Sequence, residues 1–355
     1  MGRRGIHQFA AGFNLGDAIS NEMSSLRSVF RKLGYSSEIF AENTGPGTAA
    51  YVRKYKYFKP KGKDILFYHH SIHSNVLDFI RKTKQPKILV YHNVTPPFYF
   101  EKYDLKLTYL LREGREELKQ IKDEFSLSFA VSEFNKKELE ELGYENVKLL
   151  PITYQIPSKP IFFGPRIVEL QARGPRFLFV GRISPNKKQD DLIRFAYYYL
   201  NTFGEDFQLF LVGFSSKELY LYREELERML DFYKLRRNVI ITDFLTDEGL
   251  QKMYRECDLF ISMSEHEGFC VPLLEAMVHG IPVMAFDAGA VSETLSGAGI
   301  LFKEKKMDFL AELANKIITD PKLNRAVLDT QEKRIRNFST VRPESILRPI
   351  LAEFS

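Results

Sequence analysis

The chain has 355 residues, of which 44% are hydrophobic and 27% are charged. This length suits two domains with separate hydrophobic cores, and the composition excludes a disordered chain. No apolar run approaches the roughly 20 residues that a membrane-spanning helix needs, and the basic start is not followed by the apolar segment of a secretory signal. Cys257 and Cys270 both lie in apolar stretches, which is typical of reduced, buried thiols. We therefore expect a cytoplasmic protein.

The formal net charge of +5 is weak evidence for a nucleic-acid partner, and we expect none. Residues 1–170 hold 26 Lys and Arg against 19 Asp and Glu, whereas the remainder holds 25 against 27, so the basic excess lies in the first half. It is densest in Arg53–Lys63, where lysines alternate with aromatic residues. Such a segment suits peripheral contact with an anionic membrane surface or with a phosphorylated acceptor. A solvated loop between a helix and a strand is the alternative.

Short apolar runs in the first half alternate with segments of helical period. The clearest helix is Ala18–Leu33, whose apolar residues recur on one face and which is followed by Gly34 as a C-cap signal. Continuous apolar strands separated by helices are typical of parallel sheets covered on both faces. The predicted strands are Ile6–Ala10, Asp64–Tyr68, Lys87–Tyr91, Leu127–Ser132 and Val147–Ile152.

Prolines and glycines interrupt both periodicities between Pro157 and Pro175, as in a linker, and the alternation then restarts. We expect an N-terminal Rossmann-like domain over 1–160, a linker over 161–175 and a second Rossmann-like domain over 176–338. Residues 339–355 would form a final helix that can cross back to the first domain. The predicted strands of the second domain are Arg176–Val180, Phe207–Val212, Asn238–Thr242, Asp258–Met263 and Ile281–Phe286, and the predicted helices include Glu218–Tyr233, Asp247–Arg255 and Pro343–Phe354. Two doubly wound α/β domains that face each other across a cleft fit this pattern.

The segment Ser264–Met277 follows a predicted strand and leads into a helix. Pro272 suits the first helical turn, and Gly268 allows a ligand to approach the backbone. The N–H groups of Phe269, Cys270 and Val271 would then lie at the positive end of a helix, which favours a diphosphate or sugar oxygens.

Two carboxylates flank this turn, Glu267 before it and Glu275 within the helix. A carboxylate accepts hydrogen bonds from vicinal hydroxyls, so Glu275 suits a ribose and Glu267 suits a transferred sugar. A plain strand-to-helix turn, with Glu267 as a cap and Glu275 exposed, is the alternative.

A second turn follows the first strand of the second domain. Gly181 ends this strand, where ligands bind in open parallel sheets, and Arg182 and Lys187 follow it. Arginine grips a diphosphate bidentately and lysine adds a point charge, although a basic turn alone is more often simply solvated.

Together the two segments resemble the retaining family-4 glycosyltransferases of the GT-B fold, the glycosyl transferases group 1. The signature is a pair of glutamates separated by seven residues, Glu267 to Glu275, preceded by the Gly181-Arg182 turn with Lys187. The resemblance is strong over about residues 175–305 and looser over the first half. It implies that Arg182 and Lys187 bind the donor diphosphate, that Glu275 holds the ribose and that Glu267 contacts the transferred sugar. The further donor contacts that it implies are Gly16, Gly181, Gly213, Phe244, Leu245, Gly268, Phe269, Cys270 and Val271.

In the first domain the resemblance implies a small loop over the diphosphate, with Gly16 at the helix start. Asp17 follows where the family commonly has a second glycine, so it is either a helix cap or an acceptor contact. The family often places a histidine at the end of the strand that here precedes His92, close to the donor sugar. His92 would accept a hydrogen bond from that sugar or orient the acceptor, and we count it among the catalytic residues, with a structural hydrogen-bonding histidine as the alternative. His69 and His73 are assigned to the acceptor.

Strand alternation puts His69 and His70 on opposite faces, so they cannot readily share a metal ion. No dinucleotide fingerprint or P-loop is present in the sequence, and we expect neither a metal nor another cofactor. The resulting expectation is an enzyme that moves a hexose, from GDP-mannose or a UDP-hexose, to a glycan or lipid-linked acceptor in cell-surface polysaccharide synthesis, with retention of configuration. A nucleotide-sugar epimerase of the same architecture and a non-catalytic sugar-nucleotide binding module are the alternatives.

Overall fold

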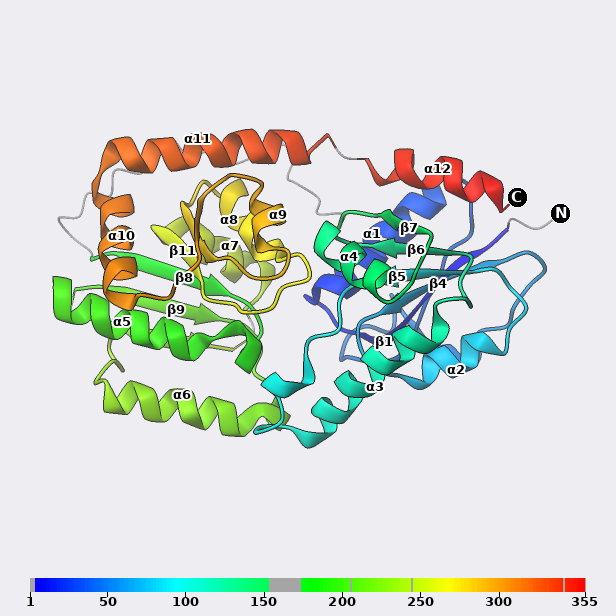
Figure 1. The fold of residues 1–355 in the computed structure, drawn as a ribbon, viewed down its shortest axis with the longest axis horizontal. Helices are drawn as coiled ribbons and strands as arrows, with labels where there is room; N and C mark the ends of the chain where they lie inside the picture. Colours follow the sequence, from blue (N-terminus) through cyan, green and yellow to red (C-terminus); the bar gives the residue numbers. More distant parts are fainter. Residues whose placement is uncertain (1–3, 153–173, 205, 244, 341, 355) are drawn as a thin grey trace. The chain divides into compact units, whose positions relative to one another are not determined.

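The structure is a computed structural model that describes residues 4–152, 174–204, 206–243, 245–340 and 342–354. The chain divides into two units, each built on its own parallel sheet (Figure 1). The first unit takes Met1–Phe98, Leu105–Gln155 and Val341–Ser355, and the second takes Tyr99–Asp104 and Ile156–Thr340. The predicted linker, residues 161–175, lies almost entirely outside the described residues.

The described strands of the first unit form one parallel sheet in the order β3-β2-β1-β4-β5-β6-β7. Every strand predicted for this half is present, and the sequence analysis missed β2 and β3. β2 ends in polar residues and β3 is a charged two-residue edge strand, so neither has the apolar run that identifies a buried strand. The bounds are β1 Ile6–Phe13, β2 Ile39–Thr44, β3 Arg53–Lys54, β4 Ile65–His70, β5 Lys87–Tyr91, β6 Leu127–Ala130 and β7 Val147–Leu149.

Helices cover both faces of this sheet. Leu26 and Phe30 of α1 and Leu347 of α12 join one apolar cluster with the strands, and α12 lies beside α1 (Figure 1). On the opposite face the Gly114 carbonyl of α3 accepts a hydrogen bond from His70 at 2.8 Å. The final helix therefore returns to the first unit, as the sequence suggested. The bounds are α1 Ala18–Lys32, α2 Asn75–Arg81, α3 Leu105–Ile121, α4 Glu133–Glu141 and α12 Pro343–Glu353.

The second unit has a parallel sheet whose described strands run in the order β10-β9-β8-β11-β12-β13. The five strands predicted here are present, and β13 is a short addition that the sequence analysis missed. β8 lies between β9 and β11, so its carboxyl end is at the point where the strand order reverses. The bounds are β8 Arg176–Val180, β9 Gln208–Val212, β10 Val239–Thr242, β11 Leu259–Ser262, β12 Val283–Phe286 and β13 Ile300–Phe302.

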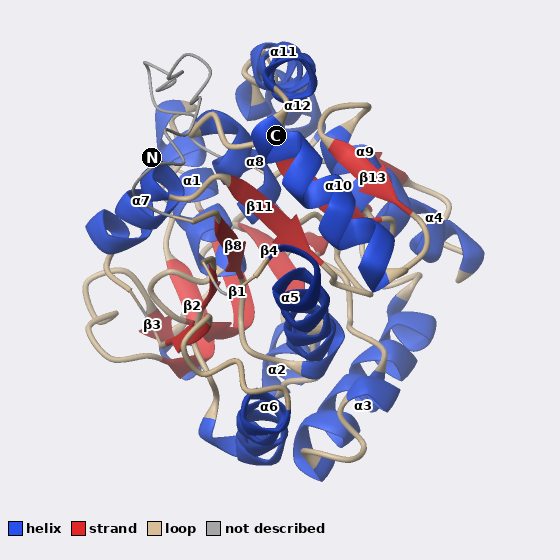
Figure 2. Cartoon of the chain, turned by 90° about the vertical axis from the view of Figure 1, so that its left-hand side faces the viewer, coloured by secondary structure: helices blue, strands red, loops and turns tan. Residues whose placement is uncertain are grey.

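Helices also cover both faces of the second sheet, and Figure 2 shows strands between layers of helix. Residues of α5, α6 and α10 share one core with the strands, whereas Tyr254 of α7 stacks on Phe260 at the other face. Gln331 of α11 is buried and bonds to the backbone of Ile281 and Val283 at 2.8 Å each, which fixes α11 to β12. The bounds are α5 Gln189–Phe203, α6 Tyr220–Phe232, α7 Asp247–Glu256, α8 Val271–Val278, α9 Val291–Leu295, α10 Met307–Thr319 and α11 Pro321–Phe338.

A short segment of the first half, Tyr99–Asp104, belongs to the second unit. The Tyr103 ring packs edge-on against Tyr222 of α6, and its hydroxyl donates to Glu225 at 2.9 Å. The chain therefore passes between the units before as well as after the predicted linker. Within the described residues, no helix is both long enough and apolar enough to cross a membrane.

The core of the first unit contains neutral histidines. His70 is fully buried between the Tyr68 hydroxyl and the Gly114 carbonyl, and burial lowers its pKa to about 4. Burial also lowers the pKa of His69 well below its usual value and that of His92 to about 3. These rings stay uncharged in the folded protein at pH values where the unfolded chain would protonate them.

We predict that the free energy of unfolding falls as the pH is lowered from 7.5 to 5. The folded pKa of His70 lies below its unfolded value, so the unfolded state takes up the proton first, and at pH 5 this costs about 2 kcal/mol for His70 alone. Urea unfolding followed by circular dichroism measures the loss, since the chain has no Trp. In His70→Gln the free energy of unfolding should fall by about 2 kcal/mol less over the same pH range. An identical pH dependence in both proteins would contradict the lowered pKa of His70.

Candidate functional site

The Gly181-Arg182 turn lies at the carboxyl end of β8, as predicted. Gly213, at the end of β9, packs directly on it, and a β-carbon at Gly213 would overlap the Gly181 carbonyl. The buried Gln189 side chain donates to the Arg182 carbonyl at 3.0 Å. The backbone of this turn is therefore fixed from both sides, while the Arg182 side chain is exposed.

The two signature segments meet in the folded unit. Lys187, in the 3-10 turn Pro185–Lys187, pairs with Glu267 at 2.6 Å between Nζ and Oε1, although 80 residues separate them in the sequence. The side chains are only 19% and 8% exposed, respectively, so the attraction is poorly screened by solvent. A cation and a carboxylate assigned to opposite parts of one donor are thus neighbours.

Hydrogen bonds of the Asn186 backbone and side chain hold the second segment against the first. The Glu265 N–H donates to the Asn186 carbonyl at 2.9 Å, and Asn186 Nδ2 donates to the His266 carbonyl at 3.4 Å. Asn186 is buried, and its Oδ1 accepts from Ser184 at 2.9 Å. The position of Glu267 therefore depends on Asn186, a residue that sequence analysis did not single out.

Helix α8 begins after a left-handed residue. Cys270 is its N-cap with φ 73° and ψ 66°, and Pro272 occupies the first turn, as predicted. Pro272 has no N–H, and the Leu273 N–H donates to the Cys270 carbonyl at 3.1 Å, so in this first turn it is the Val271 N–H that has no intrahelical acceptor by geometry. Burial, reinforced by the Glu267 carboxylate, raises the pKa of the Cys270 thiol, so it stays protonated. Gly268 and Phe269 complete the loop, and Phe269 is buried.

Glu275 is the fifth residue of α8 and is partly buried. Its Oε2 accepts a hydrogen bond from Tyr254 of α7 at 2.8 Å, and the Tyr254 ring stacks on His279 at 4.9 Å. Burial raises the pKa of Glu275, an effect that the Tyr254 hydrogen bond opposes. The residues predicted to contact the nucleotide base follow β10. Phe244 is outside the described residues, and Leu245 is partly buried.

Gly289 is a further part of this site that sequence analysis missed. It has φ 57°, and a β-carbon there would overlap the Glu267 backbone oxygen. The next residue, Ala290, donates its N–H to that same oxygen at 2.9 Å, and Thr294 bonds to the Phe269 carbonyl. The only signal in the sequence is a glycine just after the predicted strand Ile281–Phe286, which fits many turns.

In the first unit, Gly16 has φ 79° and precedes Asp17 in the turn before α1. Asp17 is the N-cap of this helix and accepts from the N–H and hydroxyl of Ser20 at 3.1 and 2.9 Å. Asp17 was predicted to be either a helix cap or an acceptor contact, and in the structure it caps α1.

The histidines assigned to the first unit have separate environments. His69 bonds to Gln8 at 3.0 Å and to His92 at 2.8 Å, while His70 bonds to residues on the opposite face, as alternation predicted. Both ring nitrogens of the buried His69 are thus used inside the unit, which leaves neither for the direct acceptor contact expected from sequence. His73 pairs with Glu117 of α3 at 2.6 Å.

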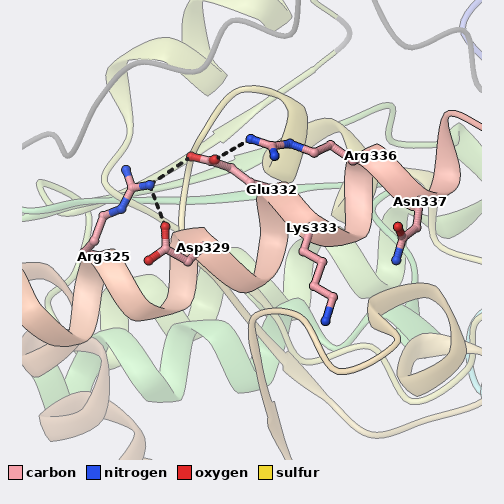
Figure 3. A pocket seen from close by; sticks show the side chains of 6 residues that line it. All are labelled: Arg325, Asp329, Glu332, Lys333, Arg336 and Asn337. Carbon is pink, nitrogen blue, oxygen red and sulfur yellow. Dashed lines mark hydrogen bonds and ion pairs between the residues drawn. The ribbon is translucent and has the colours of Figure 1, made fainter.

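A surface hollow of about 360 Å³ lies along α11, apart from the signature residues (Figure 3). Arg325 pairs with Asp329 and Glu332 at 2.5 and 3.6 Å, and Arg336 pairs with Glu332 at 3.4 Å. The hollow is lined by this one helix, and its charges largely neutralise each other. In the described part of the chain, no group of three or more His, Cys, Asp or Glu could hold a metal ion.

We predict that Gly289→Ala destabilises the second unit more than Gly297→Ala. Both glycines have left-handed backbones, with φ 57° and 82°, but a β-carbon at Gly297 meets nothing within 4 Å. Backbone strain costs each variant about 1–2 kcal/mol, and the overlap with Glu267 adds about 1–3 kcal/mol to Gly289→Ala alone. Urea unfolding measures both, and equal losses would show that Gly289 has no special contact with Glu267.

Comparisons with known proteins identify relatives of this chain. Residues 165–334 match the family described as Glycosyl transferases group 1. The serotype-specific mannosyltransferase WbdA of Escherichia coli is 35% identical over 101 residues, which cover 27% of this chain and 12% of that protein. The GDP-mannose-dependent alpha-mannosyltransferase of Mycolicibacterium smegmatis is 33% identical over 111 residues, which cover 31% of this chain and 25% of the relative. The matches thus span a quarter or less of these relatives' own lengths.

A solved structure resembles the whole chain. Anabaena HepE, in complex with UDP and glucose, has a TM-score of 0.76 and 19% identity, with 99% of this chain and 100% of that chain covered. At this identity the likeness concerns the fold, which is GT-B. Residues 165–334 thus match the glycosyl transferases group 1, and the chain as a whole has the GT-B fold.

Proposed function

We propose that this protein transfers a hexose from a nucleotide-diphosphate sugar to a glycan or lipid-linked acceptor in cell-surface polysaccharide synthesis, with retention of configuration. The observation that carries the proposal is the contact between Lys187 and Glu267 at 2.6 Å, beside the start of α8. A phosphate-binding cation and a sugar-binding carboxylate must be neighbours if one donor is to contact both.

Charge separation in the transfer step explains the residue types. As the bond between the sugar and the diphosphate breaks, the electron pair leaves with the phosphate and positive charge develops on the sugar ring. Arg182, Lys187 and the N-terminus of α8 stabilise the departing phosphate, which is typically the largest catalytic term in such sites. Because these groups supply the positive charge, we propose that no divalent cation is required.

Retention follows if the acceptor approaches on the face that the phosphate leaves. The acceptor hydroxyl oxygen then bonds to the sugar carbon, and its proton passes to an oxygen of the departing diphosphate. Glu267 binds hydroxyls of the transferred sugar, and Glu275 binds the ribose. The hydrogen bond from Tyr254 to Glu275 leaves the second carboxylate oxygen for this contact.

Two donor types fit the proposal, GDP-mannose and a UDP-hexose. The mannosyltransferases among the sequence relatives favour GDP-mannose as the first donor to assay, and HepE was solved with UDP. A thermal-shift series with both nucleotides distinguishes them, since a tight ligand raises the melting temperature by mass action. Binding without transfer to any acceptor would favour a sugar-nucleotide binding module, and isomerisation of the donor would favour an epimerase.

We predict that Lys187→Ala lowers the rate of hexose transfer by about 100-fold or more, because the variant removes charge stabilisation from the leaving diphosphate. Lys303→Ala is the matched control, since Lys303 belongs to the same unit and its side chain is 81% exposed. A radiolabelled-donor assay measures both rates, with circular dichroism as a check on folding. A near-normal rate in Lys187→Ala would remove the diphosphate assignment.

We also propose peripheral contact between Arg53–Lys63 and the anionic inner face of a membrane. In the structure Tyr55 and Phe58 are buried anchors, whereas Lys56, Tyr57 and the later lysines of the segment are exposed. This arrangement leaves an aromatic ring and several cations available on a segment that the core holds in place.

The expected result is flotation of the protein with vesicles that contain anionic lipid and not with neutral vesicles. Replacement of Lys56, Lys59, Lys61 and Lys63 by Glu should abolish flotation, since each basic residue near an anionic surface contributes about 1 kcal/mol. Replacement of Lys136 and Lys137 on α4 by Glu is the control. Equal flotation of the two variants would refute the role of the segment.

A further inference from the structure

The face of the first sheet under α1 is apolar except along one line of polar side chains. Strand alternation places Gln8 two residues after Ile6 in β1, His69 two after Phe67 in β4, and His92 two after Val90 at the end of β5. β4 pairs with both β1 and β5, so the three polar residues come from neighbouring strands. Gln8 and His69 are 0% and 1% exposed, and His92 retains some exposure.

These side chains form a continuous series of hydrogen bonds that begins on α1. Gln8 Nε2 donates to the Met23 carbonyl at 2.8 Å. Gln8 Oε1 lies 3.0 Å from His69 Nε2, and His69 Nδ1 lies 2.8 Å from His92 Nε2. The two imidazole rings are stacked, with centroids 5.1 Å apart.

The Met23 carbonyl gives the series a single direction. A carbonyl only accepts, so the Gln8 amide nitrogen must face it and the Gln8 oxygen must face His69. That oxygen accepts from His69 Nε2–H. A neutral imidazole carries one proton, which leaves His69 Nδ1 as the acceptor for His92 Nε2–H.

Burial keeps the series neutral. It lowers the pKa of His69 well below the usual value and that of His92 to about 3. With its Nε2 protonated, neutral His92 has an unprotonated Nδ1, for which no hydrogen-bond partner is found among the described residues.

We propose that Gln8 and His69 are positioning residues that hold His92 in the Nε2–H tautomer, so that Nδ1 accepts a hydrogen bond from a hydroxyl of the sugar substrate. This proposal rests on the proposed transfer function for the identity of the substrate, but the tautomer is a property of the protein alone. The buried ring of His69 thereby acts on the substrate through His92.

Long-range nitrogen–proton spectra of the full chain, recorded at pH 7.5 without donor, test the tautomer. The expected result is a His92 ring with a protonated Nε2 and an unprotonated Nδ1. In Gln8→Met the anchor is lost, and the His92 signals should move towards a mixture of tautomers. Tyr68→Phe is the reciprocal control, because it removes a partner of His70 and should leave His92 unchanged. A predominant Nδ1–H form of His92, or an unaltered His92 in Gln8→Met, would overturn the proposal.

Substitutions at His69 give a second test that does not depend on the folding of Gln8→Met. In His69→Gln the amide can donate to Gln8 and accept from His92, so the direction of the series and the His92 tautomer should be kept. In His69→Leu the direction of the series and the His92 tautomer should both be lost. Loss in both variants, with native circular dichroism, would refute the directional relay.

Turnover is the second readout. We expect the kcat of hexose transfer to fall roughly tenfold in His69→Leu and Gln8→Met, the loss typical of one hydrogen bond, and to be largely restored in His69→Gln. Unchanged kcat in His69→Leu, together with a changed tautomer, would separate His92 from the substrate. Spectra that behave as expected in a protein without any transferase activity would instead refute the proposed function and leave the relay intact.

Discussion

The contact between Lys187 and Glu267 depends on one property of parallel sheets, which is that all strands end at the same edge. β8 and β11 are hydrogen-bonded neighbours, so the turns that follow them meet although they are distant in the chain. Gly213 after β9 packs on the backbone of the first turn, and Gly289 after β12 packs on the backbone of Glu267 in the second. The candidate site is thus built on rigid strand ends, and the side chains that carry charge are added to a backbone that is already fixed.

A network of partly buried charges contacts the second turn. Lys305 pairs with Asp191 of α5 and with Glu265, two residues before Glu267, at 2.7 Å each, and its ammonium lies 4.6 Å from the Phe286 ring centroid. Removing charges from water is costly, and only several close partners offset that cost. Such a network fits one geometry and disfavours alternatives, so its contribution here is to the position of the loop more than to the overall free energy of folding.

Much of this site could be predicted from sequence because its chemistry lies in short segments. Gly181, Arg182, Glu267 and Glu275 were identified from residue type and spacing, and the strands before them from apolar runs. Partners that approach through the fold could not be identified. Tyr254 contacts Glu275 and Gly289 packs on Glu267 from other elements, while Asn186 bonds to Glu265 and His266, and nothing in the local sequence marks these contacts. His69 was placed at the strand end correctly, but its hydrogen bonds depend on the register of β1 against β4, which no local pattern reveals.

The return of α12 to the first unit has a consequence for how the protein is made. Leu347, Ile350 and Leu351 belong to the same core as Ile6 and Phe30, which are synthesised more than 300 residues earlier. On the ribosome, the sheet of the first unit can assemble early, yet one part of its apolar face stays uncovered until the last helix emerges. The second unit meanwhile has all its strands available, so the unit that begins first is the one that is completed last.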